Sequence, residues 1–502
     1  QYKLGMLQTI VKNLVFSILL ITFFGSLLNV AAQDSDKKQT EQMQVQIRQL
    51  EKQLQEMREE MAKLKESLPE KKDVASTDKN TAKTEVSSFG MASVSENKST
   101  ESQSKTQEKK QIGIDLGNNI KLIPYGTIYF NAFSNSGGTN NSDVPLWATQ
   151  SGQSNVGGSL RQTRFGARLE GAKIGNANLS AVIEADFFGG FPAIGIGENF
   201  GVVRLRLANA KINWEKTSVT IGQDWMVFAP NNPTSIAAAA IPQMAAAGNP
   251  WSRLPQIRIE RKFYKNRIIW QGAILSPQTG DFPTGTNSPA LLQPGSGAAS
   301  RLPFFQSRLA FSNANWFGTK KNGSIGISAH YGRSRVTTGT SSINNDIDSV
   351  GFALDWNFPL AKRLGISGEA FFGRNLAGFQ AGIFQNYNPD FAPRQGATLV
   401  SGGVRGIGTR GGWTQLWFTP DVLKDRLTFY GSIGLDDPRN EDLVSISVGD
   451  WRSRNLAYAF NFIFKPIPQF SLGTEFRRFE TTFTRSGRHT ANHLNLAAAY
   501  SF

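Results

Sequence analysis

Arginine and lysine side chains alternate with apolar residues at several places in the chain, a spacing that gathers cations on one face of a β-strand. The candidate residues with this spacing are Arg164, Arg168, Arg204, Arg206, Arg258, Lys262 and Arg308. Guanidinium groups stay ionised and bind carboxylates through paired hydrogen bonds. If these cations face one space, the chemistry they favour is the attraction and binding of small anions.

The elements that must position these cations are strands. From about residue 112 the chain alternates between short apolar/polar runs and turn signals, and we count sixteen runs from 120–134 to 488–502, the twelfth being 398–419. Short connections alternate with longer Gly/Asn/Pro-rich ones, which is typical of an outer-membrane barrel. The fold class we predict is therefore an all-β transmembrane barrel of about sixteen antiparallel strands, wide enough to hold an aqueous channel.

The final run predicts how the cylinder closes. Leu494, Leu496, Tyr500 and Phe502 share one face, and the run ends on the aromatic Phe502. An aromatic at the membrane interface suits a closing barrel strand, so we expect 488–502 to pair with 120–134.

The beginning of the chain predicts secretion and self-association. A basic stretch, a short apolar run and small residues before Gln33 indicate a signal peptide over 1–32, rather than a permanent membrane anchor. An unbroken heptad repeat predicts an α-helical coiled coil within 33–69, with self-association favoured over a single surface helix. The heptads do not separate dimer from trimer. Residues 70–111 have almost nothing to bury and predict a disordered linker, ahead of an outer-membrane barrel over 112–502.

Membrane insertion fixes the expected direction of the cations. An arginine facing lipid costs about 2–4 kcal/mol at the bilayer midplane, so the cations should face the lumen. Val203, Leu205 and Leu207 should then face lipid, with Arg204 and Arg206 inward. Two interpretations stay open: an arginine-lined wall that prefers anions, or a ladder in which the arginines only balance luminal carboxylates such as those of Glu184 and Asp186.

The loop 229–255 carries two short apolar runs, Ile236–Ile241 and Met244–Gly248, which suit open water poorly. Folded into the lumen, this loop would narrow the channel, with Arg253 at its returning end. The alternative is a loop that contacts a neighbouring subunit.

Other functional classes have weaker support. The chain has no Cys and 3 His, so we expect no metal site, no cofactor and no enzymatic activity. His489 and His493 would lie about 13 Å apart on one strand face, too far to share a metal. The net charge of +15 resides in strand arginines rather than in an exposed basic stripe, which argues against nucleic acid. A structural tether is a further alternative, with the barrel as anchor and the coiled coil contacting peptidoglycan.

Five segments resemble the DcaP-like porins in order and spacing, and the likeness extends over about 112–502. The segments are Arg161–Gly166, Glu184–Gly190, Arg204–Arg206, Gly222–Trp225 and Pro255–Arg258. The resemblance implies a homotrimeric diffusion channel in outer-membrane lipid, with the coiled coil in the periplasm. It also implies that the solutes are small anions such as dicarboxylic acids.

Overall fold

The computed structural model describes residues 113–190, 201–280, 294–338, 343–396, 398–423, 425–446 and 449–502. All of them belong to one compact unit, Val86–Phe502. The signal peptide, coiled coil and linker predicted over 1–32, 33–69 and 70–111 lie outside the described residues. Among the helices of the described part, none is both long and apolar enough to cross a membrane.

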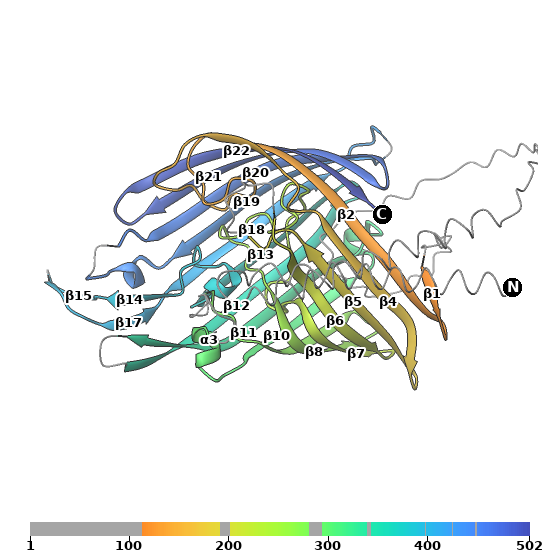
Figure 1. Cartoon of the computed structure of the whole chain (residues 1–502), viewed down its shortest axis with the longest axis horizontal. Coiled ribbons are helices and arrows are strands. Elements are labelled where there is room, and N and C mark those ends of the chain that lie inside the picture. Colours follow the sequence, from red (N-terminus) through yellow and green to blue (C-terminus); the bar gives the residue numbers. More distant parts are fainter. Residues whose placement is uncertain are drawn as a thin grey trace, which may run out of the picture. The chain divides into compact units, whose positions relative to one another are not determined.

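Sixteen antiparallel strands form a closed barrel (Figure 1). They are β2 (Ile120–Asn135), β4 (Arg164–Ile174), β5 (Ala177–Asp186), β6 (Arg204–Asn213), β7 (Thr217–Trp225), β8 (Arg253–Phe263), β9 (Ile268–Leu275), β10 (Phe304–Asn313), β11 (Gly323–Thr338), β12 (Ile343–Ala361), β13 (Leu364–Arg374), β18 (Gly408–Phe418), β19 (Leu427–Pro438), β20 (Arg452–Ile467), β21 (Phe470–Phe483) and β22 (Gly487–Ser501). Two short strands, β1 (Ile114–Gly117) and β3 (Asn155–Ser159), pair with β2 alone. The predicted fold class and strand number are confirmed.

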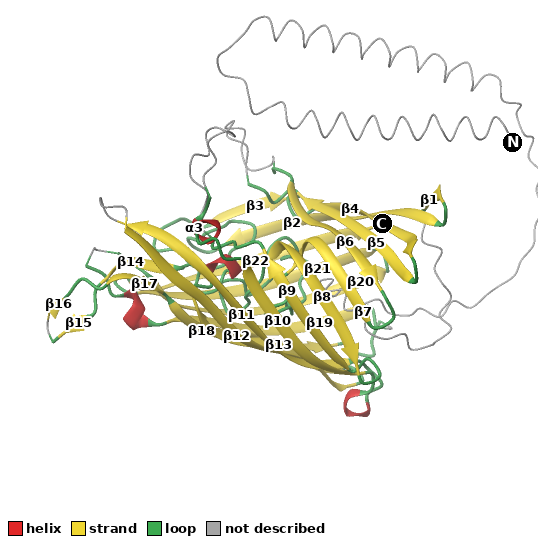
Figure 2. Ribbon diagram, turned by 90° about the horizontal axis from the view of Figure 1, so that it is seen from below, coloured by secondary structure: helices red, strands yellow, loops and turns green. Residues whose placement is uncertain are grey.

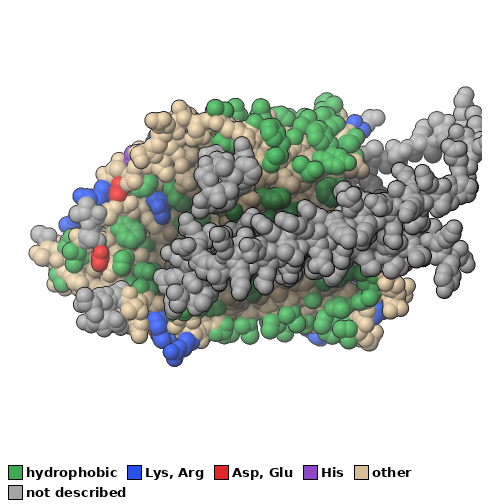
Figure 3. Space-filling model, in the orientation of Figure 1, with side chains coloured by type: hydrophobic (Ala, Val, Ile, Leu, Met, Phe, Trp, Pro, Cys, Tyr) green, Lys and Arg blue, Asp and Glu red, His purple; other side chains and the backbone are tan. Residues whose placement is uncertain are grey.

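The barrel closes between its last and first strands, as predicted. β22 pairs with β2 from Thr127 opposite Ser501 to Asn135 opposite His493. Leu496 and Tyr500 are about half exposed on the outside, whereas the alternating Asn495 and Ala499 are buried inside. Hydrophobic side chains also gather along the visible outer wall (Figure 3). This alternation gives the cylinder an apolar surface toward lipid and a polar interior.

The two ends of the barrel differ, as the connections predicted. We call the end with β1 the turn end, and the opposite end, which carries the β15–β16 hairpin, the loop end (Figure 2). One connection departs from the expected long loops, because β11 and β12 stay paired as far as Thr338 and Ile343. The β21–β22 connection at the loop end is also short, from Phe483 to Gly487.

The start of the twelfth predicted strand is wrong. Only 408–418 of the predicted 398–419 forms a barrel strand, β18. The preceding residues form β16 (Thr398–Leu399) and β17 (Gly403–Gly406), which pair with β15 (Arg394–Gln395) and β14 (Tyr387–Phe391). The chain reverses between β15 and β16, where Gly396 has a φ of 63°, and the returning segment pairs with β15 and β14 and not with the neighbouring barrel strand.

The described residues also contain three short 3-10 helices and one short helix, α3 (Ser296–Ala299). The 3-10 helices are η3 (Trp316–Gly318), η4 (Ala377–Phe379) and η5 (Asn440–Leu443). All four lie in connections, so the barrel wall itself consists of strands.

Candidate functional site

Residues 226–252, which we call the inner loop, connect β7 to β8 and lie inside the barrel. The backbone N–H of Asn231 donates to Glu369 Oε1 of β13 (2.5 Å), and the N–H of Thr234 donates to Gln415 Oε1 of β18 (2.8 Å). Glu369 and Gln415 are fully buried, and they alternate with outward-facing residues of their strands. The inner loop therefore crosses the lumen and covers the wall opposite its own strands.

The apolar part of the inner loop is also bonded to the wall near β4. The Gln162 side chain accepts from the N–H of Ala239 (2.7 Å) and donates to the carbonyl of Ala237 (2.9 Å). Farther along, Asn455 of β20 donates to the carbonyl of Ala246 (2.8 Å). These alanines thus lie against the inner wall, not in open water.

Glycine allows the inner loop to contact the wall closely. Gly248 has φ of 102°, and a Cβ there would lie 2.1 Å from the carbonyl oxygen of Gly412 in β18. The sequence expectation of a loop folded into the lumen agrees with this geometry. Its bounds differ, because residues 253–255 belong to β8, whose ladder begins at Trp225 opposite Arg253.

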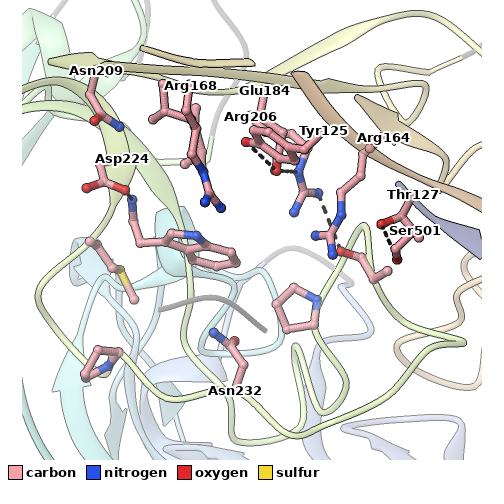
Figure 4. Close-up of a pocket in the computed structure, with 18 of the residues that line it drawn as sticks. Tyr125, Thr127, Arg164, Arg168, Glu184, Arg206, Asn209, Asp224, Asn232 and Ser501 are labelled. Atoms are coloured by element: carbon pink, nitrogen blue, oxygen red, sulfur yellow. Dashed lines mark hydrogen bonds and ion pairs between the residues drawn. The ribbon is translucent and has the colours of Figure 1, made fainter. Parts of the chain in front are cut away.

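A cavity of about 440 Å³ remains between the inner loop and the wall of β2 and β4 to β8. Arg164, Arg168 and Arg206 extend from that wall into the same space, with Asn232 of the inner loop facing them (Figure 4). Cationic side chains of β4, β6 and β8 line the cavity. They are Arg164, Arg168, Arg206, Lys211 and Arg258.

Arg204 and Arg206 are bound to the carboxylates of β5. Arg206 Nε donates to Glu184 Oε1 (2.7 Å) and its Nη1 donates to Asp186 Oδ2 (2.8 Å). Arg204 binds Asp186 through two nitrogens, and its Nη2 also donates to the carbonyl of Ala240 in the inner loop (2.9 Å). For these two arginines the structure agrees with the second interpretation, in which luminal arginines balance carboxylates. Arg204 also binds the inner loop.

Arg164 and Arg168 are held differently. Arg164 Nη2 donates to the Tyr129 hydroxyl (3.2 Å), and the side chain forms no ion pair with a carboxylate of the described residues. The Arg168 guanidinium lies over the Tyr125 ring, 4.8 Å from its centroid. A guanidinium stacked on a ring face keeps its N–H donors along its edge, directed to neighbouring groups or solutes.

Of the other four predicted cations, only one lines this cavity. Arg258 lines the cavity and donates to Asp224 (2.6 Å). Arg308 does not line it: both Nε and Nη2 bind the buried Asp355, at 2.9 and 2.6 Å. Lys262 lies at the turn end of β8, outside the cavity lining. Arg253 is also outside it, with its guanidinium 4.2 Å from the Trp225 ring centroid.

Leu207 faces the cavity, so its predicted lipid-facing position is wrong. Leu205 pairs with Ala185, yet Leu207 pairs with Glu184, so one extra residue stands in β6 at Arg206. This bulge reverses the alternation beyond it. Asn209 and Lys211 consequently face inward as well, and the simple period of two could not reveal them. In the described chain, no group of three or more His, Asp or Glu residues is arranged to hold a metal.

The fold is that of an outer-membrane channel barrel. It is similar to the crystal structure of the outer membrane channel DcaP of Acinetobacter baumannii, with a TM-score of 0.59 and 16% identity, over 78% of this chain and 99% of that one. Less similar are an anion-selective porin from Comamonas acidovorans (TM-score 0.47, 11% identity, 76% and 100% covered) and OprB of Pseudomonas putida (0.47, 10%, 77% and 94%). No family model and no curated protein matches the sequence. At 16% identity the likeness establishes a shared fold.

Proposed function

We propose that this chain is an outer-membrane diffusion channel for small hydrophilic solutes that prefers anions such as dicarboxylates or similar organic acids. The observation that carries the proposal is the charge of the cavity beside the inner loop. Five cationic side chains line it against three carboxylates, those of Glu170, Glu184 and Asp224. Fixed charge of one sign on a pore wall raises the local concentration of ions of the opposite sign.

The inner loop acts in this proposal as the constriction. Its bonds to Glu369, Gln415 and Asn455 cover the wall of the later strands, which leaves the early, arginine-rich wall as the solute path. A solute passing there would meet Arg164, which is bound to the Tyr129 hydroxyl, and Arg168, which is stacked on the Tyr125 ring. Bidentate binding by guanidinium favours carboxylates over uncharged solutes of the same size.

The remaining parts of the proposal rest on the sequence. The signal peptide 1–32 directs the chain into the secretory pathway, the barrel inserts into the outer membrane, and the coiled coil within 33–69 lies in the periplasm. The heptads support self-association, and the resemblance to the DcaP-like porins implies that the assembly is a homotrimer. Peptidoglycan is the partner proposed for the coiled coil. The linker 70–111 would let the coiled coil extend from the barrel to the peptidoglycan.

Solute uptake by proteoliposomes tests the proposal. The wild type should admit succinate faster than an uncharged sugar of similar size, and Arg164→Gln/Arg168→Gln should slow succinate about tenfold while leaving sugar uptake unchanged, as loss of electrostatic focusing predicts. Arg261→Gln is the matched control. Arg258 faces the lumen, whereas Arg261 is exposed on the opposite face of β8, where it donates to the Thr217 hydroxyl. A wild type that admits neither solute would favour the structural tether instead.

A further inference from the structure

A second cavity, of about 450 Å³, lies at the turn end on the wall of the later strands. Its lining comes from the β10–β11, β12–β13 and β18–β19 turns and from β18, β19 and β20, and it shares no residue with the first cavity. Ile463, which also lines it, belongs to the same hydrophobic cluster as Ile236 of the inner loop, and Tyr430 of the lining packs against that cluster. The second cavity therefore lies on the turn-end side of the inner loop.

The lining of the second cavity is cationic. Five cations line it against the single carboxylate of Asp425. The cations are Lys321, Lys362, Arg363, Arg426 and Lys465. Arg363 has a structural role. It forms ion pairs with Asp421 and Asp425, and it donates hydrogen bonds to the carbonyls of Thr419 and Pro420. Arg363 thus fixes the β18–β19 turn and contributes little free charge.

The other turn cations are not compensated in the same way. Lys321, Lys362 and Arg426 form no ion pair with a carboxylate of the described chain. The Lys321 ammonium lies over the Trp417 ring, 4.8 Å from its centroid. Partial burial lowers the pKa of Lys321. The nearby charges of Arg363 and Lys362 lower this pKa further, and the carboxylate of Asp425 offsets part of the effect. Crowded cations of this kind are stabilised when an anion is added.

We propose that the second cavity binds a polyvalent oxyanion of the phosphate class, dissolved in the lumen, at a site separate from the first cavity. Lysine ammonium groups are compact charges with three donors each, which suit a tetrahedral phosphate better than a planar carboxylate. The hydroxyls of Thr419 and Thr428, bonded to each other at 3.1 Å, add hydrogen-bonding capacity beside the lysines. The site extends the proposed function but does not depend on it, because binding requires no conduction.

Calorimetric titration of the full-length protein in detergent with inorganic pyrophosphate tests this site. The wild type should bind saturably, and Lys321→Gln/Lys362→Gln should weaken the affinity about tenfold or more, as expected when charge-assisted hydrogen bonds are lost. Arg426→Gln alone should weaken it about threefold by the same reasoning. Affinity should also fall steeply with added salt.

Two control variants distinguish binding in this cavity from a general attraction of anions to the basic chain. Lys216→Gln/Lys265→Gln removes two lysines from other turns at the same end and should leave the affinity unchanged. Arg164→Gln/Arg168→Gln should also leave it unchanged, even though succinate uptake falls. No saturable binding by the wild type, or equal weakening by the lysine control, would overturn the site. Pyrophosphate binding that persists while succinate uptake fails would overturn the channel and leave the site standing.

Discussion

Replacing residues 227–251 with a tight turn is expected to raise the single-channel conductance about twofold or more, since a sixteen-stranded barrel without an inner loop is an open aqueous channel. The replacement is geometrically feasible because β7 and β8 are neighbours and their ladder ends at Trp225 opposite Arg253. Antiparallel neighbours can be joined by a two-residue hairpin. Conductance in planar bilayers measures the change.

The barrel should survive this replacement. Glu369, Gln415 and Gln162 would lose their partners in the inner loop, but water in the widened lumen can take those hydrogen bonds. The control shortens the β15–β16 hairpin (Arg394–Leu399), which pairs only with itself. That variant should keep the wild-type conductance. An unchanged conductance after removal of the inner loop would mean that the loop does not limit the channel.

Arg308→Met is expected to destabilise the barrel by about 3–5 kcal/mol, the cost of leaving a buried charge without its partner. Nε and Nη2 of Arg308 donate to the two carboxylate oxygens of Asp355, and both side chains are almost fully buried (4% and 0% exposed). Thermal unfolding followed by gel mobility measures the loss. Because Arg308 lies outside the first cavity, the channel's ion preference should not change.

The double variant Arg308→Met/Asp355→Leu provides the internal comparison. Removing both charges should recover most of the stability, because apolar residues of similar volume can replace a buried ion pair. A stable Arg308→Met barrel with weakened anion preference would contradict the structural role of this pair and return Arg308 to the solute path.

The sequence predicts the barrel well because lipid on one side and polar space on the other impose a strict alternation. That alternation is visible in β22, and it correctly predicts its closure against β2. It also predicts that the side chains of Arg164, Arg168 and Arg258 face the lumen and not the lipid. Alternation is a property of one strand, however, and it says nothing about partners on other strands.

The parts that could not be predicted depend on register and on loops. Arg308 and Asp355 lie on β10 and β12, so their pairing requires the register of two ladders. The bulge at Arg206 leaves no mark in the residue types, yet it turns Lys211 inward. Likewise, the apolar runs of the inner loop predict that it folds inward, but its route depends on wall groups such as Gln415.

The basic wall beside the inner loop is the central claim, and the reversal potential of single channels in a KCl gradient tests it most directly. The wild type should prefer anions, with the reversal potential moving toward zero in Arg164→Gln/Arg168→Gln and staying unchanged in Arg261→Gln. Cation preference in the wild type, or an unchanged reversal potential in Arg164→Gln/Arg168→Gln, would contradict it.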